Sequence, residues 1–465
     1  MRWQNNFEKI KMERNLFTPA ITKNLKVGFL RYPNIREDER RHKRDFKHLK
    51  NFGASMLGNE LMNAGYEVKI TDKENAHTFD IILISLTSNL DMISLFMHIG
   101  NDNKWNNRKF KVLAGGFGMQ NYIPISEIID YAWYGRCENE IVWLLDNNLD
   151  VEHKSLLKIG KHKEVYINQS LNLYPNVYES GIGSTKEEIY GCPNKCFFCH
   201  YSFARKYIKT GNNLYSFNQG YTASIEIEQC KSELYTQYNI PKVYSSIDGY
   251  SERLRYAANK RISNSQIIEF IEHIATNTTC KSVIIMLYNI SGYETENETD
   301  YMEFVETLNK VTTDLRVDVD LNIHTTPLNP SILTPLAYSA ININENYRDK
   351  RMTQIFNSKK LHARNSMYLE SQIGLLDHTI PIRTTIDNVE IFKTICSVTY
   401  RNKRLNDKLN ILNGINGFND ICRAYDITET LPTEYVKGYI SYEQLRNMRT
   451  KFLMALKKQK REEKK

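Results

Sequence analysis

Three cysteines within eight residues constrain this chain more than any other feature of its sequence. Residues 191–200 read GCPNKCFFCH, which gives the spacing C-x3-C-x2-C. Three thiolates on one tight loop can bind a soft metal centre. Two kinds of centre fit: an iron–sulfur cubane, whose ligands are normally four thiolates, or a structural zinc site with His200 or another cysteine as fourth ligand.

The zinc interpretation meets a geometric difficulty. Cys199 and His200 are neighbours in the chain and cannot easily close one tetrahedron, and no second cysteine pair lies nearby in the sequence. The spacing alone leaves both centres open.

The loop resembles the signature of the radical S-adenosylmethionine (SAM) enzymes, C-x3-C-x-aromatic-C, with Phe198 as the aromatic residue. The resemblance implies that Cys192, Cys196 and Cys199 ligate a [4Fe-4S] cluster and leave one iron open. In that family the open iron chelates SAM, and an electron from the cluster splits SAM into methionine and a 5′-deoxyadenosyl radical. It also implies that Phe198 lies against the adenine, and that an electron donor such as flavodoxin or ferredoxin serves the enzyme.

Length and composition restrict the class of protein. A chain of 465 residues suggests about two or three domains. The net charge of +8 is a mild excess, so nucleic-acid binding is not indicated. Five of the eight cysteines are isolated, which favours a reduced cytosol over a secreted disulfide framework. We expect a cytoplasmic protein, because neither a signal peptide nor a membrane span is visible.

Residues 24–150, which follow an N-terminal arm of residues 1–23, alternate strand-like and helix-like patterns. This alternation predicts a Rossmann-like, doubly wound parallel sheet. Strands are expected at 25–31, 66–70, 81–84, 111–114 and 129–134, and helices at about 46–64, 90–98 and 139–145.

Two loops of this unit are candidate ligand sites, because such sheets bind ligands beyond the carboxyl ends of their strands. Ser85-x-Thr87, followed after 27 residues by Gly115-Gly116, resembles the second and third parts of the cobalamin-binding pattern. Glycines there let the backbone approach a bulky nucleotide tail. The first part, Asp-x-His-x-x-Gly, is absent, and His42 lies in a charged run in its place. The resemblance implies either bound cobalamin or a domain that keeps the fold without the cofactor.

A second unit is expected at residues 181–345, after a linker at 151–180. The resemblance implies a partial (β/α)6 barrel of the TIM type, in which catalytic groups lie at the carboxyl ends of the strands. Residues 187–190 are predicted to form its first strand and to deliver the cysteine loop. Further strands are expected at 242–247, 282–288 and 315–323, and a capping box at Ser263 and Gln266 predicts a helix.

Two further loops resemble SAM-binding segments of the family. Asp248 and Gly249 stand where a Gly-Gly-Glu-like loop binds the SAM amine, although Asp248 could instead cap a turn. Residues 289–296 resemble a Gly-x-x-Glu-Thr-Glu-Glu-Asp stretch, which implies that Gly292 packs against adenosine. Glu294 could instead cap the next helix.

The run at 315–323 alternates strictly, with apolar residues at odd positions. Its polar face holds Arg316, Asp318, Asp320 and Asn322 and continues to His324. In a barrel strand covered outside by helices, this face must point into the lumen and would line a substrate cavity. Asp320 or His324 could then act as a proton acceptor. The alternative is an edge strand with one solvent-exposed face.

The resemblance implies a radical SAM enzyme. With cobalamin, the expected reaction is methyl transfer to an unreactive carbon; without it, a rearrangement, cyclisation or bond cleavage. A zinc-stabilised, non-catalytic binding protein is the remaining alternative. Residues 346–465 are expected to form a mainly helical extension, with a helix at about 442–456.

Overall fold

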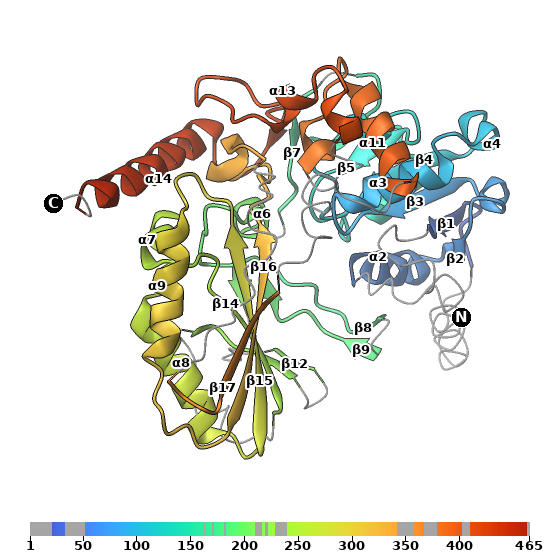
Figure 1. Cartoon of the computed structure of the whole chain (residues 1–465). Helices are drawn as coiled ribbons and strands as arrows, with labels where there is room; N and C mark the ends of the chain where they lie inside the picture. The colour runs from blue at the N-terminus through green and yellow to red at the C-terminus, as the bar shows by residue number, and fades with distance from the viewer. Residues whose placement is uncertain are drawn as a thin grey trace.

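The computed structural model describes residues 21–32, 52–161, 163–169, 172–180, 183–209, 216–218, 222–227, 240–341, 357–366, 379–401 and 410–462. Two six-stranded sheets form its frame, one near each end of the molecule, and helices cover them (Figure 1). The prediction of a mixed α/β fold with parallel sheets is confirmed.

The first sheet has the strand order β2-β1-β3-β4-β5-β6. Its first five strands are parallel and follow the order of flavodoxin-like sheets. The strands are β1 (Lys26–Leu30), β2 (Glu67–Thr71), β3 (Ile81–Ser85), β4 (Lys111–Gly115), β5 (Tyr131–Trp133) and β6 (Leu156–Lys158). Strand β6 is antiparallel to β5, so the segment at 151–180, expected to be a linker, also contributes an edge strand.

Helices and two buried clusters cover this sheet. The helices are α2 (Phe52–Asn63), α3 (Leu90–Ile99), α4 (Asn103–Asn106) and α5 (Ile141–Asp146), with short 3-10 turns η1 (Ala76–Thr78) and η2 (Ile123–Ile125). Helix α2 ends before Gly65, whose φ of +87° provides the predicted stop. Residues 46–51 and His42 lie outside the described residues.

The second sheet has the order β12-β13-β14-β15-β16-β17, and its strands from β13 to β17 are parallel. Its strands are β12 (Ser216–Asn218), β13 (Thr222–Ser224), β14 (Lys242–Ser246), β15 (Ser282–Ser291), β16 (Asp318–Pro327) and β17 (Leu361–Ser366). Helices α8 (Asn264–Asn277) and α9 (Glu298–Asn309) pack on one face. The capping box predicted at Ser263 is present.

Two expectations for this unit need correction. Strand β10 (Ile189–Tyr190) precedes the cysteine loop as predicted, but it pairs with β11 (Ile208–Lys209) in a separate antiparallel sheet. Gly191 explains this geometry: its φ is +75°, and a Cβ there would lie 2.5 Å from the Lys206 carbonyl oxygen, so the chain returns tightly on itself. Strand β17 lies beyond residue 345, so the second sheet continues into the segment expected to be a helical extension.

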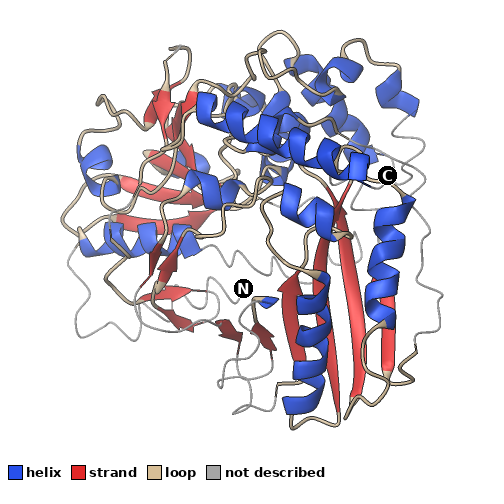
Figure 2. Ribbon diagram, turned by 90° about the vertical axis from the view of Figure 1, so that its left-hand side faces the viewer, coloured by secondary structure: helices blue, strands red, loops and turns tan. Residues whose placement is uncertain are grey.

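The C-terminal segment connects the two halves of the molecule. It contains α11 (Val389–Arg401), α13 (Phe418–Cys422) and α14 (Tyr442–Glu462). Helix α11 packs on α3, and α14 packs on α7 (Glu252–Ala257). Figure 2 shows the helix that ends at the C-terminus lying across the top of both sheets. Small sheets are formed by β7 (Val165–Tyr166) with β18 (Val436–Lys437) and by β8 (Tyr178–Ser180) with β9 (Gly183–Thr185).

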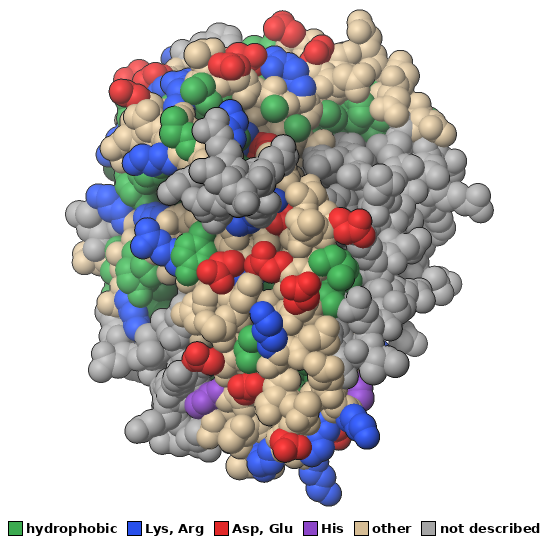
Figure 3. All heavy atoms as spheres, turned by 60° about the vertical axis from the view of Figure 1, so that its left-hand side comes forward, with side chains coloured by type: hydrophobic (Ala, Val, Ile, Leu, Met, Phe, Trp, Pro, Cys, Tyr) green, Lys and Arg blue, Asp and Glu red, His purple; other side chains and the backbone are tan. Residues whose placement is uncertain are grey.

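Two observations concern the surface and the membrane. No helix within the described ranges combines the length and apolarity that a membrane crossing requires. On the face drawn in Figure 3, acidic and basic side chains are interspersed.

Candidate functional site

The cysteine loop is fixed by its backbone on both sides. The Phe197 amide donates to the Ala258 carbonyl (2.9 Å), and the Phe197 carbonyl accepts from the Leu336 amide (3.2 Å). The Cys199 amide donates to the Cys196 carbonyl (2.9 Å), and Cys199 is the N-cap of α6 (His200–Ala204). The loop is therefore held between the end of α7 and η5 (Pro335–Tyr338).

The three thiols of this loop lie close enough to influence one another. Cys196 is buried, and Cys192 and Cys199 are partly exposed. Burial raises the pKa of Cys196 to about 12, and Asp248 and the other two thiols add to the rise. Burial also raises the pKa of Cys192, again with a contribution from Cys199. Three thiols from one loop match the donor set of an iron–sulfur cluster.

No three His, Cys, Asp or Glu side chains in the described part of the chain are grouped to hold a single metal ion. Thiolates of a cubane bind three different iron atoms, so they need not converge on one point. His200, the suggested fourth zinc ligand, is buried, and its Nδ1 lies 2.8 Å from the Ile332 carbonyl oxygen. Its ring packs on Phe117, 5.0 Å away between centroids. Burial lowers the pKa of His200 to about 4.

Lys260 is a charged neighbour of the thiols that sequence reasoning missed. Its Nζ lies 2.9 Å from Ser246 Oγ and 3.3 Å from Asp248 Oδ2, and its side chain is only 5% exposed. Its charge opposes the rise in the pKa of Cys192 and Cys196. The sequence carries no signal for this role, because Lys260 stands in an ordinary polar turn between two helices.

The loop after β14 holds the predicted Asp248 and Gly249. Asp248 has a φ of +55°, and burial raises the pKa of its carboxyl group. Its carbonyl accepts from the Tyr293 hydroxyl (2.7 Å), and the Gly249 carbonyl accepts from Arg255 (2.9 Å). Each carbonyl keeps a second lone pair, so a backbone contact to a ligand amine is compatible with these bonds.

The loop after β15 begins at Gly292, whose φ is +92°. The amides of Gly292 and Tyr293 donate to the Glu296 carboxylate, at 2.7 and 3.1 Å. Glu294 does not cap the next helix, because Asn297 and Asp300 form the capping box of α9. Glu294 instead pairs with a side chain of α14.

Hydrophobic packing joins these loops. Phe198 packs against a buried cluster to which Tyr293 belongs. Phe198, Asp248 and Gly292, predicted on three separate segments, therefore lie around one region.

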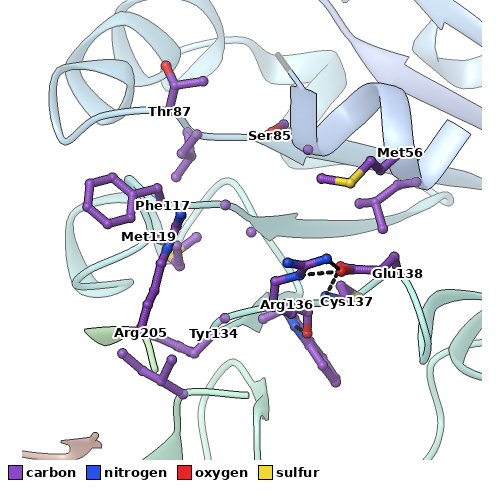
Figure 4. Close-up of a pocket in the computed structure, with 18 of the residues that line it drawn as sticks. Met56, Ser85, Thr87, Phe117, Met119, Tyr134, Arg136, Cys137, Glu138 and Arg205 are labelled. Atoms are coloured by element: carbon purple, nitrogen blue, oxygen red, sulfur yellow. Dashed lines mark hydrogen bonds and ion pairs between the residues drawn. The ribbon is translucent and has the colours of Figure 1, made fainter. Parts of the chain in front are cut away.

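A cavity of about 780 Å³ opens at the carboxyl ends of β3, β4 and β5. Its lining includes the predicted Ser85, Thr87, Gly115 and Gly116, and also His200. Figure 4 shows Ser85 and Thr87 on one side of the cavity and Tyr134 and Arg136 on the opposite side. The cavity thus extends from the first sheet to the helix that follows the cysteine loop. Its volume lies within the range of small-molecule and cofactor sites.

The structure gives two of the predicted residues a role in the fold. A Cβ on Gly116 would lie 2.4 Å from the Leu86 carbonyl oxygen, so close backbone packing itself requires glycine there. The Thr87 hydroxyl donates to Asp91 Oδ2 (2.7 Å). Gly115 differs, because a Cβ there would meet Trp133 atoms only at 3.4 and 3.5 Å.

Cations and aromatic rings form the wall nearest the cysteine loop. The Arg205 guanidinium lies 4.4 Å from the Tyr201 ring, 4.8 Å from Phe117 and 5.2 Å from Tyr190. The Arg205 side chain reaches toward Phe117, which follows the glycine pair in the chain (Figure 4). No pattern in the sequence indicates Arg136, whose Nη1 donates to both carboxylate oxygens of Glu187, each at 2.9 Å.

Asp320 and His324 lie on the face of β16 opposite α8 and α9. Val319, Leu321 and Ile323 are fully buried on the helix side, as the alternation predicts. The Asp320 side chain is 42% exposed and lies 4.0 Å from Arg364, and the His324 ring packs edge-on against Tyr288 at 5.7 Å.

No protein-family model matches the chain, and no curated protein matches it significantly. Among solved structures, the radical SAM methyltransferase TsrM from Kitasatospora setae, with cobalamin and [4Fe-4S] cluster bound, is 10% identical; the match covers 66% of this chain and 71% of TsrM, with a TM-score of 0.29. The cobalamin-dependent radical enzyme OxsB, with aqua-cobalamin and SAM bound, is 13% identical over 95% of this chain and 61% of OxsB, again with a TM-score of 0.29.

With aqua-cobalamin alone, OxsB gives 13% identity over 98% of this chain and 62% of OxsB, with a TM-score of 0.28. The chain thus spans about three fifths of the length of OxsB. The structural neighbours are cobalamin-dependent radical SAM enzymes. TM-scores of this size do not establish a common fold.

Proposed function

We propose that this chain is a radical SAM enzyme in which Cys192, Cys196 and Cys199 hold a [4Fe-4S] cluster. The observation that carries the proposal is the cysteine loop itself: three mutually close thiols, held by backbone bonds at Phe197, beside Asp248 and Lys260. We further infer that the first sheet is a Rossmann-type unit and the second a partial barrel.

The cluster and SAM would supply the radical chemistry, and the protein's own residues bind, orient and shield. The backbone hydrogen bonds at Phe197 hold the three thiols in fixed positions relative to one another. Lys260 places a buried positive charge beside groups that must lose protons in order to ligate iron. Phe198, Asp248 and Gly292 surround the region where SAM would lie.

The polar face of β16 is the proposed substrate side. His324 presents a ring nitrogen on the face that α8 and α9 leave open. Asp320 presents an acceptor oxygen on the same face but near the amino end of β16, away from the loops that follow β14 and β15. Burial lowers the pKa of His324, which keeps its imidazole neutral near pH 7 and able to accept a proton.

The cavity favours a second, narrower proposal: a corrinoid binds there, and the reaction is methyl transfer to an unreactive carbon. The cavity joins the predicted Ser85 and Gly115 loops to the helix after the cysteine loop, so one ligand could contact both units. If no corrinoid binds, a rearrangement, cyclisation or bond cleavage is the proposed alternative. A flavodoxin- or ferredoxin-like protein is the proposed electron donor.

Formation of 5′-deoxyadenosine tests the first proposal. The protein would be purified without oxygen, reconstituted with iron and sulfide, reduced and incubated with SAM. We expect the product from the native chain and none from Cys196→Ala. Zinc without iron in the anaerobically purified protein would instead support the binding-protein alternative.

Equilibrium titration with hydroxocobalamin tests the second proposal. We expect one corrinoid per chain and weaker binding by Gly115→Val, which narrows the cavity at its first-sheet wall. SAM cleavage without corrinoid uptake would leave only the cobalamin-independent reactions.

A further inference from the structure

The C-terminal helix α14 buries a stripe that contains one charged residue. Leu445, Arg449, Phe452 and Leu456 are spaced four, three and four residues apart, so they share one face of the helix, and none is more than 4% exposed. An arginine in the middle of a buried stripe is costly unless it is paired. Its partner therefore indicates what the helix is built to hold.

That partner is Glu294, in the loop after β15. The Arg449 side chain is 4% exposed and that of Glu294 is 27% exposed. Arg449 Nη1 and Glu294 Oε2 have no hydrogen-bond partner in the part of the chain that the structure describes, so the pair is joined at one point and is not a two-bond fork. A lysine could reproduce such a contact, whereas a two-bond fork would require arginine.

Phe452, the next residue of the buried stripe, contacts the loop after β15 and, through Tyr293, the loop after β14. The Phe452 ring lies 6.3 Å from that of Tyr293 and beneath the Arg449 guanidinium, which is 5.3 Å away. Tyr293 is buried, and its hydroxyl donates to the Asp248 carbonyl (2.7 Å). One side of α14 thus supports two of the proposed SAM-binding loops.

Helix α14 also supports the cysteine loop. It packs on α7 and on η5, and these two elements supply Ala258 and Leu336, which hold Phe197 by its backbone. Phe198 packs against the buried cluster that contains Phe452 and Leu456. All three loops proposed to surround SAM therefore meet this helix or its immediate neighbours.

We propose that Arg449 and Phe452 are positioning residues, through which α14 fixes the three loops in the arrangement that binds SAM. This inference rests on the proposed function. It gives the C-terminal segment a role in cofactor binding, in addition to its role in the fold.

The test measures SAM affinity by equilibrium dialysis with radiolabelled SAM, on the full chain reconstituted without oxygen. Arg449→Met keeps the length and apolar stem of the side chain but removes the charge, and we expect about tenfold weaker SAM binding. Arg449→Lys should bind within about twofold of the native chain, because a single contact is retained. Met454→Ala, at a position on the same helix that is 63% exposed, is the matched control.

A second cycle separates positioning from folding. Glu294→Gln should weaken SAM binding to a similar degree, and its combination with Arg449→Met should be no worse than either change alone, because both remove one contact. Iron content and hydroxocobalamin affinity should stay unchanged in all variants. If Arg449→Met precipitates, Phe452→Leu, a milder change on the same face, should still weaken SAM binding about threefold.

Native-like SAM affinity in Arg449→Met, or equal weakening in Arg449→Lys and Arg449→Met, would overturn the inference and leave the proposed function standing. Absence of SAM binding by the native, cluster-loaded chain would overturn both this inference and the proposed function.

Discussion

At the scale of single residues, Lys260 shows how the fold places charge where the sequence gives no hint of it. Its ammonium group is buried between Ser246 and Asp248, next to a loop of thiols. Breaking a buried ion pair leaves an uncompensated charge, which is far more costly than losing a surface pair. Asp248, whose side chain is 12% exposed, would be that stranded charge; Glu226, the other carboxylate near Lys260 at 3.7 Å, is 46% exposed and can be solvated.

We therefore expect Lys260→Met to lower the free energy of unfolding by about 3 kcal/mol. Adding Asp248→Asn should restore a large part of the loss, because it removes the stranded carboxylate. Thermal unfolding of the two single variants and the double variant checks this. Additive losses in the double variant would show that the two side chains do not interact.

Glu296 makes a prediction about pH. Burial raises its pKa from 4.5 to about 7, and one of its oxygens has no hydrogen-bond partner within the described residues. Below pH 4.5 the group is protonated in both the folded and the unfolded chain. As the pH rises toward 7, the unfolded chain loses the proton first, so the folded state loses about 3 kcal/mol of relative stability.

Glu296→Gln should abolish this loss. The native chain should lose thermal stability relative to Glu296→Gln between pH 5 and pH 7, and the difference should level off above pH 7. Exposed Glu298→Gln serves as the control. A difference between Glu296→Gln and the native chain that does not change with pH would contradict the raised pKa.

At the scale of elements, the adjacent glycines after β4 should respond differently to the same change. Gly116 has a φ of +103° and would clash with the Leu86 carbonyl at 2.4 Å, so Gly116→Ala should destabilise the chain by about 2 kcal/mol. Gly115→Ala meets its nearest atoms only at 3.4 Å and should cost within about 0.5 kcal/mol. Urea denaturation of both variants tests this, and equal losses would mean that the loop can relax around Gly116.

The sequence predicted elements well where the pattern was strong and local. The five parallel strands of the first sheet, the alternation in β16 and the capping box at Ser263 follow from periodicity and capping chemistry, whereas β6 lies in a segment expected to be a linker. The pairing of β10 with β11 could not be predicted, because a strand of two residues has no detectable periodicity. The requirement for glycine at position 191 is visible only in the structure, where the Lys206 backbone packs against it.

The same division holds for the candidate site. The cysteines, and the loops at Ser85 and Gly115, could be found from spacing and from strand ends. Lys260 and the Arg449–Glu294 pair could not, because each depends on contacts between segments far apart in the chain. A contact between distant segments produces no recognisable pattern in the local sequence around either residue.

At the scale of the whole molecule, the C-terminal segment is part of both halves. The first turns of α14 belong to the large buried cluster beside the first sheet, through Tyr442 and Leu445. Its later turns belong to the cluster beside the cysteine loop, through Phe452 and Leu456. The cavity and the cysteine loop are therefore held by one continuous framework.

The central claim is that three thiolates hold a cluster with one iron open to SAM. Electron paramagnetic resonance of the reconstituted, reduced chain, recorded with and without SAM, tests it most directly. We predict the signal of a reduced [4Fe-4S] cluster whose line shape changes when SAM is added, and no such signal in Cys196→Ala. A cluster signal that SAM leaves unchanged, or an undiminished signal in Cys196→Ala, would contradict the account.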